Sequence, residues 1–121
     1  MKKVSLIWIV FMGFIACDDI IEVVDISNET VTVLAPSNES VIDTTLVNFS
    51  WQALEDVETY HIQVATPNFT EASQILLDTM VTKTEVSRQL NINEFEWRIK
   101  ALNSGYETTY STQKFSVVAN N

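Results

Sequence analysis

The sequence predicts an all-β protein, a seven-stranded sandwich of two sheets that follows a cleaved leader. Three observations carry this prediction. Apolar residues recur at every second position in several short segments, which is the spacing of half-buried strands. No segment beyond the leader sustains the apolar stripe of a helix. Proline, glycine and short runs of Ser, Asn and Asp separate the alternating segments, as turns should.

The alternation is clearest in four segments, whose inward-facing members we expect to form the core: Val47, Phe49 and Trp51; Tyr60, Ile62 and Val64; Phe95, Trp97, Ile99 and Ala101; Phe115 and Val117. Three weaker segments, residues 30–34, 75–78 and 83–87, complete the seven strands. The same alternation places both tryptophans of these segments in the core and His61 on an outward face, as a solvated or cross-strand side chain.

The first seventeen residues resemble a bacterial lipoprotein signal. Lys2 and Lys3 precede thirteen uncharged residues, 4–16, which are too few for the ~20 that a membrane-spanning helix needs. The run ends at Ala16, and the only cysteine of the chain, Cys17, follows it directly. The resemblance implies that residues 1–16 are removed as a signal peptide and that the Cys17 thiol is lipidated, anchoring the protein in a membrane.

The residues after Cys17 indicate a location outside the cytoplasm. Residues 17–28 are rich in acids and lack a clear period, so we interpret them as a short acidic tether. Acids directly after a lipidated cysteine resemble an inner-membrane retention signal in some bacteria and a surface-export signal in others. We expect the cell envelope, with the outer membrane preferred over the inner one and its periplasmic and surface faces both open.

Composition excludes several classes of function. The chain carries 16 acidic and 7 basic residues, a net charge of −9, which repels phosphate backbones and makes nucleic acid a poor partner. Beyond the leader there is one glycine, Gly105, so no Gly-rich phosphate loop can form. One histidine and one cysteine leave neither a zinc cluster nor a His-based nucleophile pair. We therefore expect no cofactor, no metal and no enzymatic activity.

Residues 29–118 resemble a fibronectin type III domain of the bacterial extracellular kind, and residues 119–121 are left as a tail. The motifs that carry the resemblance are residues 34–38, 49–51, 60–66, 95–103 with Gly105, 110–111 and 115–117. Phe95 stands where that family commonly has a tyrosine, so a tyrosine corner cannot form there. The resemblance implies an immunoglobulin-like sandwich that binds or spaces and does not catalyse.

The resemblance also places two candidate contact loops at one end of the sandwich. Glu55, Asp56 and Glu58 crowd the loop between the second and third strands, and Tyr106 lies in the loop between the sixth and seventh. The acidic run lacks the spaced Asp and Asn pattern of a calcium loop. An aromatic ring beside carboxylates suits sugar hydroxyls or a basic protein patch. Phe69 and Tyr110 are weaker aromatic candidates at other loop positions.

Two functions fit these observations. The first is a non-enzymatic, lipid-anchored module outside the cytoplasm, used for protein interaction or for spacing at the cell envelope. The alternative is an accessory glycan-binding surface lipoprotein of a polysaccharide-uptake system. In both cases the expected partners are the membrane, through lipid on Cys17, and an envelope protein or a glycan.

Overall fold

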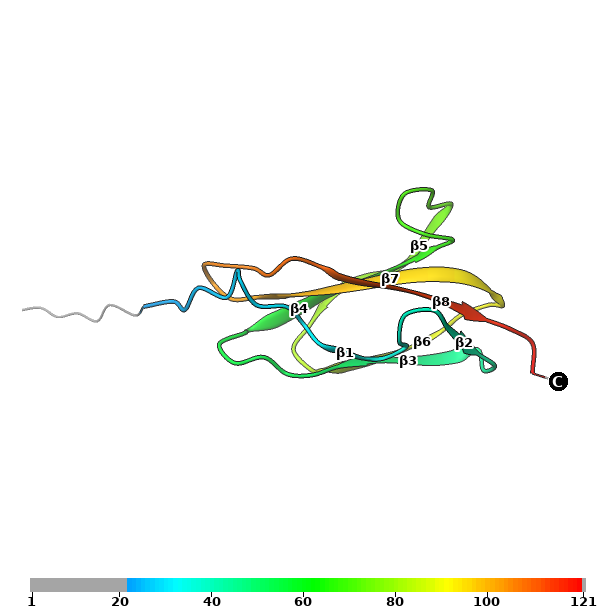
Figure 1. The fold of residues 1–121 in the computed structure, drawn as a ribbon, viewed down its shortest axis with the longest axis horizontal. Helices are drawn as coiled ribbons and strands as arrows, with labels where there is room; N and C mark the ends of the chain where they lie inside the picture. The colour runs from blue at the N-terminus through cyan, green and yellow to red at the C-terminus, as the bar shows by residue number, and fades with distance from the viewer. Residues whose placement is uncertain (1–21, 121) are drawn as a thin grey trace, which may run out of the picture.

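Residues 22–120, which the computed structural model describes, form two β-sheets packed face to face (Figure 1). The smaller sheet has the order β1 (Val33–Ala35), β3 (Leu46–Trp51), β6 (Glu85–Gln89). The larger sheet has the order β2 (Ser40–Ile42), β8 (Ser111–Val117), β7 (Asn93–Leu102), β4 (Thr59–Thr66), β5 (Gln74–Val81). Neighbouring strands are antiparallel except for β2 and β8, which are parallel. The all-β sandwich is confirmed, and the described residues contain no helix that could cross a membrane.

The described residues form eight strands and not the expected seven, because the first strand is divided. β1 pairs with β3 in the smaller sheet, whereas β2 pairs with β8 in the larger one. Between them the chain bends through buried Pro36, which has no N–H to donate, and through Glu39, whose φ of 67° lies in the left-handed region. The three weaker segments are strands with shifted bounds, β5 being the longest of them.

Both tryptophans of the sandwich lie in its core, as the alternation predicts. Trp97 is fully buried and Trp51 is 2% exposed. Phe49 packs edge-on against Trp97 at 5.0 Å between ring centroids and against Phe115 at 5.8 Å. The Nε1–H of Trp97 donates to the carbonyl oxygen of Pro36 at 3.1 Å, while Trp51 Nε1 has no hydrogen-bond partner among the described residues. These aromatic contacts join the two sheets.

The packed structure begins before residue 29, where the sequence places the domain boundary. Ile26, in the expected tether 17–28, is 2% exposed and belongs to the core cluster. Residues 22–28, the entry segment, therefore contact the sandwich over their last part and do not serve only as a spacer. Cys17 and the expected signal peptide lie outside the described residues.

The chain enters the sandwich at one end and leaves it at the other (Figure 1). The entry segment lies at the end that carries the β3–β4 and β7–β8 loops, and β8 leads to the C-terminus at the opposite end. The two ends of the described segment, residues 22 and 120, are thus separated along its longest axis.

Candidate functional site

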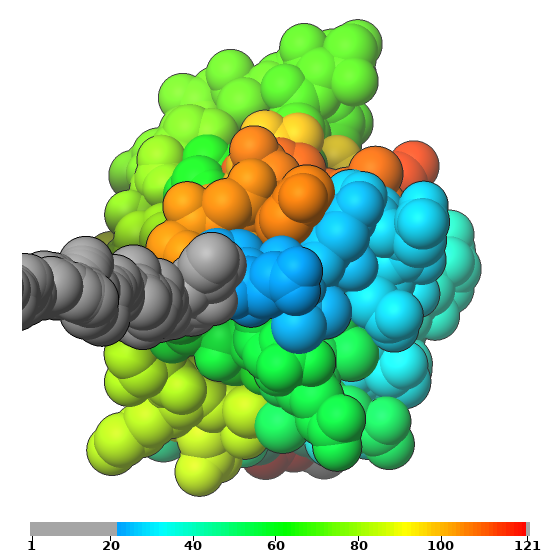
Figure 2. Space-filling model, turned by 90° about the vertical axis from the view of Figure 1, so that its left-hand side faces the viewer, coloured from blue at the N-terminus to red at the C-terminus, as the bar shows by residue number. Residues whose placement is uncertain are grey.

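The two loops that hold the predicted contact residues lie at the entry end of the sandwich. β4 begins at Thr59 opposite Leu102, the last residue of β7, so the loops 52–58 and 103–110 emerge side by side. The Nδ2 of Asn103 ties them together, because it donates to the carbonyl oxygens of Asp56 at 3.0 Å and Val24 at 2.9 Å. The entry segment is therefore fixed to both loops. Figure 2 views this end and shows the entry segment (blue) between the 103–110 loop (orange) and the 52–58 loop (green).

The predicted contact side chains are solvent-exposed at this end. Tyr106 is 40% exposed, and Glu55, Asp56 and Glu58 are all exposed. Asp56 has a φ of 65°, a left-handed conformation that Asp adopts more readily than most residues and that turns the loop back toward β4. Within residues 22–120 no three His, Cys, Asp or Glu side chains are grouped so that they could hold a metal ion. The role of these four residues in binding stays a prediction.

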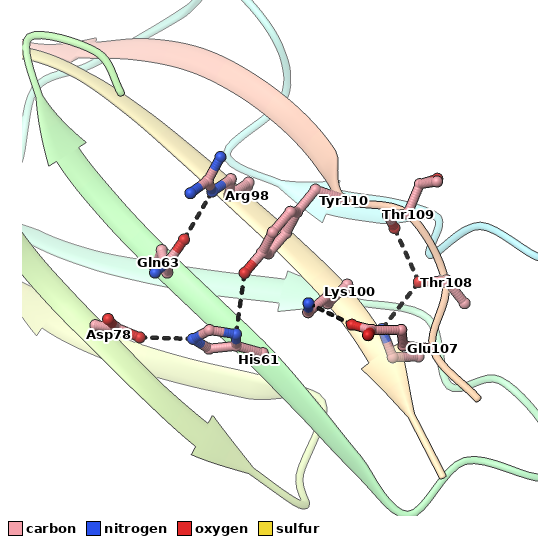
Figure 3. Close-up of polar contacts among 10 residues, drawn as sticks. His61, Gln63, Asp78, Arg98, Lys100, Glu107, Thr108, Thr109 and Tyr110 are labelled. Carbon is pink, nitrogen blue, oxygen red and sulfur yellow. Dashed lines mark hydrogen bonds and ion pairs between the residues drawn. The ribbon is translucent and has the colours of Figure 1, made fainter. Parts of the chain in front are cut away.

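A second polar site lies on the outward face of the larger sheet, where sequence reasoning suggested only the weaker candidates Phe69 and Tyr110. It consists of eight side chains, here called the outer-face network: His61, Gln63, Phe69, Asp78, Arg98, Lys100, Glu107 and Tyr110. Figure 3 shows most of these residues converging from β4, β5, β7 and the segment that precedes β8.

His61, on β4, links β5 to the segment that precedes β8. Its Nε2 lies 2.6 Å from Asp78 Oδ1, and because an ionised carboxylate only accepts, the imidazole donates there. Its Nδ1 lies 3.0 Å from the hydroxyl of Tyr110, which donates to it when the ring is neutral. The hydrogen bond from His61 holds the pKa of the Asp78 carboxyl below its usual value. The expectation of a cross-strand histidine is confirmed.

Arg98 occupies the centre of the network, between two aromatic rings. Its guanidinium carbon lies 4.1 Å from the ring centroid of Phe69 and 4.3 Å from that of Tyr110, within the range of cation–π contacts. Its Nε donates to Gln63 Oε1 at 2.7 Å. Lys100 also lies over the Tyr110 ring, at 4.7 Å, and forms an ion pair with Glu107. The hydrogen bond from Lys100 lowers the pKa of the Glu107 carboxyl.

The two weaker aromatic candidates, Phe69 and Tyr110, are part of this network. Both are half-buried, and both rings rest on Arg98. The backbone N–H of Phe69 donates to Glu96 Oε1 at 2.9 Å, which brings the segment after β4 back onto β7. Alternation could place Arg98 on the outward face, but only the strand register shows that it lies opposite Gln63.

Comparison with known proteins identifies solved structures of the same fold, but no matching family model and no matching curated sequence. No protein-family model matches the chain, and no curated protein matches its sequence. Among solved structures, fibronectin(III)-like modules of CbhA from Clostridium thermocellum match with a TM-score of 0.55 at 13% identity, over 76% of this chain and all of that one. The fn3 domain of the human collagen alpha-1(XX) chain matches with 0.56 at 13% identity, over 77% of this chain and 85% of that one. The fibronectin type III domain of human KIAA0970 protein matches with 0.53 at 8% identity, over 76% and 75%.

The chain has a fibronectin type III-like fold. Identities this low show the fold and leave the ligand open, since one fold hosts many functions. Within the fibronectin type III-like sandwich the loops at the entry end and the outer-face network are two candidate surfaces, which share the 103–110 loop through Glu107 and Tyr110.

Proposed function

We propose that this protein is a lipid-anchored, non-enzymatic module of the bacterial cell envelope that supports or spaces a binding surface outside the cytoplasm. The observation that carries the proposal is the arrangement of the chain's two ends. The entry segment is bound to the sandwich by buried Ile26 and by the Asn103 hydrogen bond, and the C-terminal end lies at the far end. A module of this shape, anchored at its N-terminus, holds its far end away from the membrane.

Lipidation of Cys17 would bring the entry end close to the bilayer. Only four residues lie between Cys17 and Glu22, the first described residue, and the five residue-to-residue steps span at most about 18 Å when extended. Two or three acyl chains hold a protein far more firmly than one, because each buried methylene contributes ~0.8 kcal/mol. Tyr106 and the acidic 52–58 loop would then face the membrane side, and the far end would point outward.

The residue inventory supports a non-enzymatic role. His61 is the only histidine of the chain, and both of its ring nitrogens are occupied by side chains of the outer-face network. The hydroxyl beside it belongs to Tyr110, a phenol whose ring packs against Arg98 and Lys100 on an open sheet face. Nucleophilic catalysis needs an activated group in a site that excludes water, and an open sheet face supplies no such enclosure.

Fractionation of cells tests the anchor. The full chain and Cys17→Ala are expressed in a lipoprotein-competent bacterium, with Asp18→Asn as a control that keeps the cysteine. We expect the wild type and Asp18→Asn in the membrane fraction, cleaved before residue 17, and Cys17→Ala released or uncleaved. Equal membrane association of the wild type and a Cys17→Ala variant that has lost its leader, or a wild type that is not cleaved before Cys17, would show that the anchor is wrong.

Accessory glycan binding is the second candidate, and the entry-end loops provide one way to test it. Binding of the protein to glycan arrays and to envelope extracts is measured at low and high salt, with and without chelator. Contacts with a basic protein weaken as the Debye length falls from ~10 Å at 0.1 M salt to ~3 Å at 1 M, whereas stacking on a sugar changes little. If Tyr106→Ala together with charge reversal of Glu55 and Asp56 leaves binding intact, these loops are not the contact surface.

A further inference from the structure

Arg98 is a half-buried cation without a carboxylate partner among residues 22–120. The ion pairs of the described residues join His61 to Asp78 and Lys100 to Glu107, and Arg98 belongs to neither. Its side-chain hydrogen bond runs from Nε to Gln63 Oε1, which Figure 3 draws as a single dashed line. A guanidinium has five N–H groups, and only the Nε–H is used in this bond. The N–H groups of Nη1 and Nη2 therefore remain available to a ligand.

Lys83, Arg88 and Lys114 also form no ion pair among the described residues, but all three are exposed, whereas Arg98 is half-buried. Three carboxylates lie on or beside the same face, and each is engaged by another donor. Asp78 accepts from His61, Glu107 accepts from Lys100, and Glu96 accepts from the backbone N–H of Phe69. Each of these carboxylates therefore has a hydrogen-bond donor other than the terminal N–H groups of Arg98.

The surroundings of Arg98 also hold its guanidinium in one orientation. Phe69 and Tyr110 lie at 4.1 Å and 4.3 Å from the guanidinium carbon, and Gln63 fixes the Nε edge. Because these contacts are already present, little side-chain entropy remains to be lost when a ligand binds. A planar carboxylate that accepts two parallel N–H bonds is the group that best matches such a fork.

We propose that the outer-face network is a binding site for an acidic sugar, in which Arg98 receives the carboxylate of a hexuronic acid residue. Thr112, which is exposed directly opposite Arg98 on β8, can bond to a sugar hydroxyl. Gln63 Oε1 and the Tyr110 oxygen are already bonded to Arg98 and His61, but each retains a lone pair that can accept from a further hydroxyl. The rings of Phe69 and Tyr110 offer apolar surface to the sugar's C–H groups. The net charge of −9 repels a dense polyanion, so we expect isolated uronate residues between neutral sugars.

This inference names a ligand class for the interaction role proposed above, and it does not depend on the lipid anchor. The anchor is tested at Cys17 and the sugar site at Arg98, so each can fail without the other. The site also differs from the predicted contact residues, because Glu55 and Tyr106 lie in the loops 52–58 and 103–110, whereas Arg98 lies within β7 of the larger sheet.

The test is a titration of the full chain, purified in detergent, with a uronate-containing oligosaccharide and with the same oligosaccharide after its carboxyl groups are reduced to alcohols. Calorimetry gives the affinity, and the 15N-detected Nε–H signal of Arg98 reports on the site. The variants are Arg98→Gln and Arg98→Lys, which keeps the charge and the aromatic contacts but lacks the fork. Arg88→Gln is the matched control, because Arg88 is exposed on β6 in the other sheet.

We expect the uronate sugar to bind saturably and to shift the Arg98 signal. The carboxyl-reduced sugar and Arg98→Gln should each weaken binding by about tenfold or more, which corresponds to the loss of one charged hydrogen bond. Arg98→Lys should weaken it by a smaller factor, and Arg88→Gln should bind like the wild type. Equal affinity for the reduced sugar, unchanged binding by Arg98→Gln with its fold intact, or tighter binding of a sulfated sugar would overturn the assignment. Absence of saturable binding at millimolar uronate would overturn it as well.

Discussion

Replacing each core tryptophan by phenylalanine should lower the free energy of unfolding by two different amounts, although the two tryptophans are almost equally buried. Trp97 and Trp51 are 0% and 2% exposed, and both pack in the same aromatic cluster at 6.3 Å between ring centroids. Their indole nitrogens differ. Trp97 Nε1 donates to Pro36 O at 3.1 Å inside the core, whereas Trp51 Nε1 is buried without a partner among the described residues.

The expected difference in unfolding free energy follows from these two nitrogens. Both substitutions remove one ring of the indole and share a cavity cost of about 24 cal/mol per Å³. Trp97→Phe also loses a hydrogen bond and leaves the buried Pro36 carbonyl unsatisfied, which costs about 1–3 kcal/mol. Trp51→Phe removes an unpaired buried N–H, so part of its cavity cost is offset. Trp97→Phe should therefore be the more destabilising substitution by at least about 1 kcal/mol.

Urea unfolding of a chain that begins at Asp18 measures this difference. Far-UV circular dichroism and the fluorescence of the remaining tryptophan provide two probes, and their agreement checks that unfolding is two-state. Tyr106→Ala serves as the surface control, because its side chain is 40% exposed and its loss should cost less than ~1 kcal/mol. If Trp51→Phe destabilises the protein as much as Trp97→Phe, the hydrogen bond to Pro36 does not have the role assigned to it.

Three further predictions concern the entry segment, the strained turn and the outer-face network. Ile26→Ala should cost about 2–5 kcal/mol in urea unfolding, because Ile26 is a core residue; a cost near zero would mean that the entry segment is only a tether. Glu39→Gly should stabilise the protein by about 1 kcal/mol, since Glu39 has a φ of 67° that glycine adopts without a Cβ clash; destabilisation would show that the Glu39 side chain matters. Asp78→Asn should lower stability near neutral pH by well under ~1 kcal/mol, because the carboxylate is 51% exposed. The His61 hydrogen bond lowers the folded-state pKa of Asp78, so its contribution is present above the unfolded-state pKa of about 3.9 and is lost as pH falls through the lower folded-state pKa. An effect of Asp78→Asn that persists unchanged in acid would exclude this linkage.

The core strands were predictable because a strand with one buried and one exposed face alternates apolar and polar residues in its sequence. Phe49, Trp51 and Trp97 fall on the alternating positions, and all three are buried. β2 was missed because its two apolar residues, Val41 and Ile42, are adjacent and do not alternate, and because its parallel pairing with β8 joins segments far apart in the chain. The burial of Ile26 was missed for a related reason, since the acidic stretch around it has no period.

The outer-face network depends on information that a single sequence does not contain. Alternation placed His61 and Arg98 outward, but their partners are set by strand register and by the path of a loop. Asp78 comes within reach of His61 through the pairing of β4 with β5, and Phe69 covers Arg98 because the segment after β4 folds back onto β7. The loops at the entry end were easier to place, because the order of strands alone brings them together.

We proposed that Cys17 anchors this fibronectin type III-like module to a membrane, and intact-mass spectrometry of the protein from its host membranes tests the anchor most directly. We expect a chain that begins at Cys17 and carries the added mass of a diacylglycerol group, with or without a further N-terminal acyl chain. A chain that retains residues 1–16, or one with an unmodified Cys17 thiol, would contradict it.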